Sequence, residues 1–67
     1  MSNIGEKIKE LRKEHNISQW SLAKQIGVSQ KAIDFWEKGI NEPKATYIIS
    51  LAIYFKVSAD YLLGLEE

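Results

Sequence analysis

Few side chains in this 67-residue chain are suited to catalysis. There is no cysteine, which excludes disulfides and thiolate metal sites, and the single histidine, His15, cannot form a metal site alone. The sequence has no glycine-rich phosphate loop and no nucleophile at motif spacing from His15. We therefore expect no enzyme, no cofactor, no metal and no small-molecule site.

One short segment carries four side chains that can contact the edges of nucleic-acid bases: Gln30, Lys31, Asp34 and Phe35. Gln can pair with adenine, Lys can donate to guanine, Asp can accept from cytosine, and Phe can press on a thymine methyl group. If the segment is a helix with Ile33 in the core, all four lie on its other side. The alternative is that these are ordinary solvated residues on an exposed helix. Asp34 in particular would repel DNA phosphates, which is unfavourable unless it reads cytosine or orients Lys31.

The first element expected is a helix from Ile4 to about Glu14, because apolar residues recur there at spacings of four and three. Its inward residues are Ile4, Ile8 and Leu11. Asn3 followed by Glu6 is a capping-box pattern, and Asn16 favours the left-handed conformation that ends many helices.

Two short helices are expected next, one between Ser18 and Gly27 and one between Ser29 and Gly39. Each begins after a serine that can cap free amides and stops at a glycine. Their inward residues are expected to be Leu22, Ala23, Ile26, Ile33 and either Trp36 or Glu37. The tight turn at Gly27 brings the two helices close together.

After a loop at residues 40–43, the pattern predicts a fourth helix from about Lys44 to Phe55 and a last helix capped by Ser58. Their inward residues are expected to be Ile48, Leu51, Ala52, Phe55, Leu62 and Leu63. No strand pattern or repeat is present. The sequence therefore predicts an all-α fold of five helices, with residues 1–67 forming one domain.

The segment from Gln19 to Gly39, QWSLAKQIGVSQKAIDFWEKG, resembles the helix-turn-helix of the phage repressor and Cro-type (XRE) family. The matching positions are Gln19, Leu22, Ala23, Gly27, Val28, Ser29, Ile33, Glu37 and Gly39. The resemblance continues on both sides and covers nearly the whole chain. It implies a compact lambda-repressor-like fold whose third helix enters the DNA major groove while the second crosses the backbone.

The resemblance also implies roles for individual residues. Gln19 is similar to a family residue that binds phosphate, and Arg12 and Glu37 match a structural ion pair beneath the motif. The resemblance thus implies that the four base-contacting residues are Gln30, Lys31, Asp34 and Phe35. Around them, the expected phosphate contacts are Gln19, Ser29, Lys38, Asn41 and Lys44.

Two positions depart from the family pattern. Lys56 stands where the family usually ends its fourth helix with glycine, so a lysine with positive φ is expected there. Lys44 stands where a capping serine is common, so the fourth helix is expected to begin less tightly.

Surplus apolar surface is expected beyond the core. Tyr47 and Tyr54 share a stripe outside the core face of the fourth helix. This stripe is either an overlarge core face or, with Tyr61 and Leu65, a candidate surface for a dimer or a partner. Trp20 is expected to be exposed, where it could contact the DNA backbone or a partner.

The composition leaves two functions open. Nine basic residues balance nine acidic ones, although the first 44 residues hold eight bases and six acids. We expect a cytoplasmic, homodimeric transcriptional regulator, a repressor of a double-stranded DNA operator, with no membrane segment. The alternative is a protein-interaction module, or antitoxin-like partner, that keeps the helix-turn-helix as a scaffold. Zero net charge favours this alternative.

Overall fold

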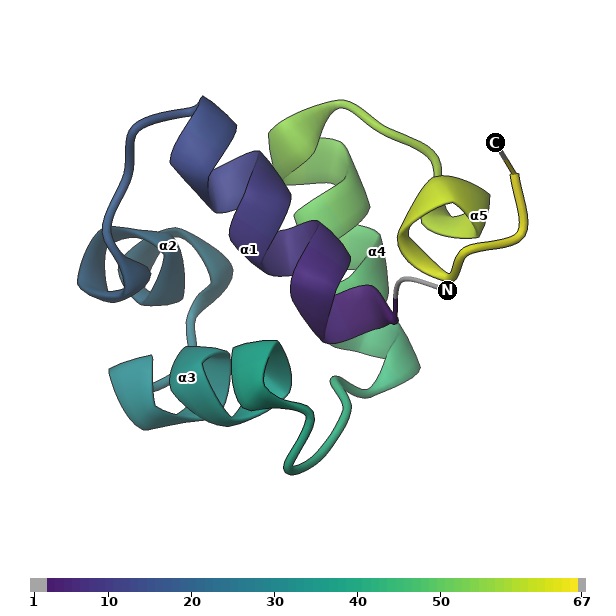
Figure 1. The fold of residues 1–67 in the computed structure, drawn as a ribbon. Helices are drawn as coiled ribbons and strands as arrows, with labels where there is room; N and C mark the ends of the chain where they lie inside the picture. The colour runs from purple at the N-terminus through teal and green to yellow at the C-terminus, as the bar shows by residue number, and fades with distance from the viewer. Residues whose placement is uncertain (1–2, 67) are drawn as a thin grey trace.

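Five helices make up the fold in the computed structural model, which describes residues 3–66 (Figure 1). They are α1 (Ile4–Glu14), α2 (Gln19–Ile26), α3 (Gln30–Lys38), α4 (Ala45–Phe55) and α5 (Ala59–Leu62). Within residues 3–66 there is no strand. The all-α, five-helix architecture predicted from the sequence is confirmed.

Polar side chains fix the starts of four helices. At α1, the Asn3 side chain accepts from the Glu6 amide at 2.9 Å and the Glu6 carboxylate accepts from the Asn3 amide at 3.2 Å, which completes the predicted capping box. Serine hydroxyls accept backbone amides at the other three: Ser18 from Ser21, Ser29 from Ala32, and Ser58 from Tyr61. Each satisfies an amide that has no partner within its helix.

Left-handed residues end three of the helices. Gly27 closes α2 with φ of 87° and Gly39 closes α3 with φ of 76°. Lys56 closes α4 with φ of 59°, as its departure from the family pattern predicts. Lys44, at the start of α4, makes no capping hydrogen bond with its side chain, so that helix lacks the cap that the others have.

The core takes one large, fully buried side chain from each helix: Ile8, Leu22, Ile33, Leu51 and Leu62. In Figure 1, α2 and α3 lie together on one side of α1, and α5 lies on the other. Helix α3 packs against both α1 and α2. Its orientation is therefore determined by two neighbours.

Gly5 allows α1 and α3 to approach each other closely. A Cβ atom at this position would lie 2.0 Å from the backbone carbonyl oxygen of Trp36, a separation that no real Cβ atom adopts. The obstacle is the backbone of α3, so a larger residue cannot be accommodated by moving one side chain. Only glycine permits this distance between the two helices.

Two expectations about the apolar residues are wrong. Leu63 does not close the core: α5 ends one residue earlier, and the Leu63 side chain is 48% exposed. The tyrosines do not lie beyond the core, because Tyr47, Tyr54 and Tyr61 are half-buried and packed against it. Tyr47 contacts Trp36 and Tyr54 contacts Phe55. The surplus apolar surface includes Leu65, as expected, but its other members are residues not named for it: Ile40, Ile49, Ile53 and Leu63.

Replacing Gly5 with alanine should destabilise the fold by about 1–3 kcal/mol, because the methyl group forces α1 away from α3. In an unconstrained helix the same change stabilises by about 1 kcal/mol. Urea denaturation shows directly whether the free energy of unfolding falls or rises. An unchanged or raised stability of Gly5→Ala would contradict the close approach.

Replacing Lys56 with glycine should stabilise the chain by about 1 kcal/mol, because glycine adopts positive φ without the steric cost that lysine carries. A thermal melt should show the midpoint rising by about 4–8 °C. Lys9→Gly is the matched control. Lys9 is exposed within α1, where glycine should instead cost about 1 kcal/mol. A lower midpoint for Lys56→Gly would show that the lysine makes a compensating contact.

Candidate nucleic-acid interface

Helices α2 and α3 form a rigid pair joined by the turn at residues 27–29. The amides of Gly27 and Val28 both donate to the carbonyl of Ala23, at 2.8 and 3.0 Å, which closes the end of α2. Val28 is half-buried against the core beneath the turn. The turn is therefore fixed both by hydrogen bonds and by packing, and α3 begins at once after it.

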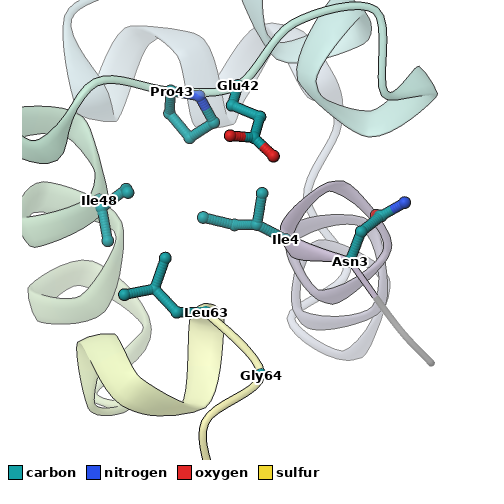
Figure 2. Close-up of a pocket in the computed structure, with 7 residues that line it drawn as sticks. All are labelled: Asn3, Ile4, Glu42, Pro43, Ile48, Leu63 and Gly64. Carbon is teal, nitrogen blue, oxygen red and sulfur yellow. The ribbon is translucent and has the colours of Figure 1, made fainter.

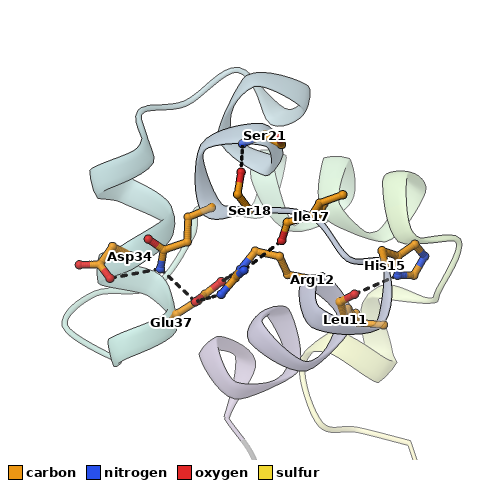
Figure 3. Close-up of polar contacts among 9 residues, drawn as sticks. Leu11, Arg12, His15, Ile17, Ser18, Ser21, Asp34 and Glu37 are labelled. Atoms are coloured by element: carbon orange, nitrogen blue, oxygen red, sulfur yellow. Dashed lines mark hydrogen bonds and ion pairs between the residues drawn. The ribbon is translucent and has the colours of Figure 1, made fainter.

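An ion pair between Arg12 and Glu37 ties α1 to α3 (Figure 3). Arg12 Nε donates to Glu37 Oε2 at 2.7 Å and Nη2 donates to Oε1 at 3.1 Å. A third donor, Nη1, reaches the carbonyl of Ile17 in the α1–α2 loop at 3.0 Å. The two side chains are only 13% and 4% exposed. One guanidinium thus fixes α1, the following loop and α3 together.

Gln19 joins α2 to the same network. Its Nε2 donates to Glu37 Oε1 at 3.1 Å and to Asp34 Oδ1 at 3.2 Å. Both amide hydrogens are therefore occupied by α3. The phosphate contact expected of Gln19 requires one of these two bonds to be exchanged for a bond to DNA.

The hydrogen bonds of the network shift two pKa values. Hydrogen bonding to Glu37 raises the pKa of Arg12 above its ordinary value, against the opposing effect of burial. Hydrogen bonds from Lys38 and then Gln19 lower the pKa of Asp34. Because the folded chain lowers this pKa, the Asp34 carboxylate adds stability at neutral pH, and the contribution is lost as the pH falls through the lowered value.

The side of α3 away from the core carries the residues expected to read bases. Gln30 and Lys31 are exposed, and Phe35 and Asp34 are half-buried. The Lys31 ammonium lies 5.5 Å from the centre of the Phe35 ring, within the range of a cation–π contact. Asp34 pairs with Lys38 at 2.9 Å rather than with Lys31. The outward side of the helix therefore carries an amide, an ammonium and a partly exposed aromatic ring.

The residues expected to contact phosphates surround this face. Lys38, Asn41 and Lys44 are exposed at the end of α3, in the following loop and at the start of α4. Ser29 is exposed, and its oxygen accepts the Ala32 amide while its own hydrogen is available to donate. Trp20 is 56% exposed at the start of α2, with the Lys24 ammonium 4.7 Å from its ring centre. Trp36 is buried in the core.

Sequence reasoning did not find a pocket of about 240 Å³ beside the α3–α4 loop. Figure 2 shows Ile4, Ile48 and Leu63 pointing toward one another across it, with Pro43 and the Glu42 carboxylate at its edge. The start of α1, the end of α5, the α3–α4 loop and α4 each contribute to its wall (Figure 2). Residues so distant in the sequence give no periodic signal, so the pocket could not be foreseen.

Among residues 3–66, no group of three or more His, Cys, Asp or Glu side chains is placed to hold a metal ion. None of the helices in that range combines the length and the apolar character that a membrane span requires.

The sequence model described as Helix-turn-helix (HTH_3) matches residues 8–62 of the chain. The chain belongs to this helix-turn-helix family. Among curated members, it is 40% identical to Repressor protein C2 of Salmonella phage P22 over 60 residues, 90% of the chain. It is 39% identical to the HTH-type transcriptional activator BcrR of Enterococcus faecalis over 64 residues, 96% of the chain.

These helix-turn-helix relatives are longer proteins. The chain spans 28% of the length of the P22 repressor and 31% of BcrR. The crystal structure of the P22 c2 repressor in complex with a synthetic operator superposes with a TM-score of 0.92 and 36% identity. The superposition covers 98% of this chain and 100% of the repressor chain that the crystal structure contains. The resemblance to repressor and Cro-type regulators is confirmed.

Removing one member of the Arg12–Glu37 pair should destabilise the fold by about 3–5 kcal/mol, because the remaining charge is left without a partner in a nearly buried site. The variants are Arg12→Met, Glu37→Met and their combination, in a Lys56→Gly background that is expected to be more stable. The double variant should lose clearly less than the sum of the two single losses, as measured by urea denaturation.

The exposed pair between Asp34 and Lys38 is the matched control, with an expected coupling below about 1 kcal/mol. Additive losses for Arg12 and Glu37 would show that the buried pair does not hold α1 to α3.

Proposed function

We propose that this chain is a cytoplasmic transcriptional regulator that binds a specific double-stranded DNA operator, with α3 in the major groove. Residues 1–67 form one DNA-binding domain in this proposal. The observation that carries it is that Gln30 and Lys31 are exposed on the outer side of α3, while the Arg12–Glu37 ion pair attaches the other side of the helix to α1. The similarity to an operator-bound repressor supports the same orientation.

In this proposal, Gln30, Lys31 and Phe35 contact base edges. Lys38, Asn41 and Lys44 contact phosphates on one side of the groove, and Ser29 and Gln19 contact them on the other. Eight basic residues lie in the first 44 positions, so positive charge is concentrated in the segment that includes α3 despite the zero net charge.

We also propose that the chain binds as a homodimer to two half-sites spaced by about one helical turn of DNA. The exposed Leu63 and Leu65 side chains, next to the pocket lined by Ile4 and Ile48, supply an apolar surface for a second copy. The three tyrosines first considered for this surface contribute only their exposed edges.

Selection of bound duplexes from a random DNA pool tests the proposal. It should enrich one sequence in two symmetric copies, and binding should weaken steeply as salt rises because several phosphates are neutralised. Lys31→Ala should relax the preference at one base position by about 1–3 kcal/mol. Lys9→Ala, a change of the same type on α1, should leave base preference unchanged.

Two results together would contradict the proposal and favour the interaction-module alternative. They are the absence of any enriched DNA sequence and the salt-independent capture of a protein partner. Regulation is tested with the enriched sequence placed beside a reporter promoter: lower expression marks a repressor, and higher expression marks an activator.

A further inference from the structure

Asp34 lies between two of the side chains that this proposal assigns to phosphates. Its Oδ2 is 2.9 Å from the Lys38 ammonium, and its Oδ1 accepts from the Gln19 amide at 3.2 Å. The Asp34 side chain is 30% exposed and that of Lys38 is 61% exposed. The carboxylate is therefore near the surface that would meet DNA, and it already restrains both donors.

The two effects of this carboxylate differ between kinds of DNA complex. On any DNA it repels phosphates and neutralises Lys38, which lowers the number of counterions that binding releases. In a complex with fixed geometry, however, its hydrogen bonds also hold Lys38 and Gln19 in one orientation. Donors held in advance lose less conformational entropy when they bind. This restraint of the two donors offsets the repulsion and the neutralisation only where the phosphates are correctly placed.

We infer that Asp34 is a specificity-determining residue rather than a reader of cytosine: it weakens binding to random DNA by repelling phosphates and neutralising Lys38, and its restraint of Lys38 and Gln19 offsets that loss only on the operator. This inference rests on the proposed function. The exposed ion pair is weak enough, at most about tenfold in an equilibrium constant, for a well-placed phosphate to exchange with it. A chain with zero net charge then gains its affinity mainly from base contacts.

Asp34→Asn tests this assignment, because asparagine keeps an oxygen that can accept from Gln19 but removes the charge that holds Lys38. Binding is measured by fluorescence anisotropy with a random-sequence duplex and with the selected operator, between about 50 and 200 mM salt. Affinity for the random duplex should rise about threefold to tenfold, and the slope of log affinity against log salt should steepen by about one. Operator affinity should change less, so the ratio of operator affinity to random-duplex affinity should fall.

Two further variants distinguish the contact between Asp34 and Lys38 from the effect of net charge alone. Glu14→Gln removes one negative charge from the exposed end of α1, which carries none of the residues assigned to DNA, and should leave the ratio unchanged. Asp34→Asn in a Lys38→Met background should raise random-duplex affinity less than it does alone. Thermal melts establish that each variant is folded, and Asp34→Ser replaces Asp34→Asn if the latter is not.

The outcomes are distinct. Unchanged random-duplex affinity and salt slope in Asp34→Asn would overturn the inference while leaving the proposed function intact. A loss of operator affinity confined to sites with cytosine at one position would also overturn it, and would show that Asp34 reads that base. A wild-type chain that binds no duplex would overturn the proposed function and this inference with it.

Discussion

The orientation of α3 depends on a single guanidinium group that has little freedom to move. The planar fork of Arg12 directs two donors to the Glu37 carboxylate and a third to the Ile17 carbonyl. Apolar contacts in the core exclude water and supply most of the stabilisation, but they tolerate small rotations of one helix on another. Hydrogen bonds of fixed direction do not. The angle between α1 and α3 is therefore set by this group, together with the missing side chain at Gly5.

Much of the fold could be predicted from the sequence because its signals are local. Capping residues before an apolar run and turn residues after it act within one helical turn, so the existence of all five helices, and the ends of all but the last, followed from neighbouring residues. The positive φ of Lys56 was predicted from the resemblance to the family, which usually has glycine at that position. The buried residues of α1 to α4 followed from helical periodicity.

What could not be predicted depends on contacts between distant segments. Nothing near Gly5 in the sequence indicates that the backbone of α3 passes 2.0 Å from its missing Cβ. The bonds from Gln19 to Asp34 and Glu37 join two helices whose relative rotation no propensity specifies. The exposure of Leu63 depends on α5 ending after one turn, and a pair of adjacent leucines does not show which of them faces inward.

The division of labour within α3 has a consequence for engineering. Ile33, Trp36 and Glu37 hold the helix from behind, while Gln30, Lys31 and Phe35 contribute little to that attachment. Substitutions at those three outward positions should therefore cost little folding stability. New sequence preferences could be built on this scaffold one side chain at a time, without redesign of the core that supports them.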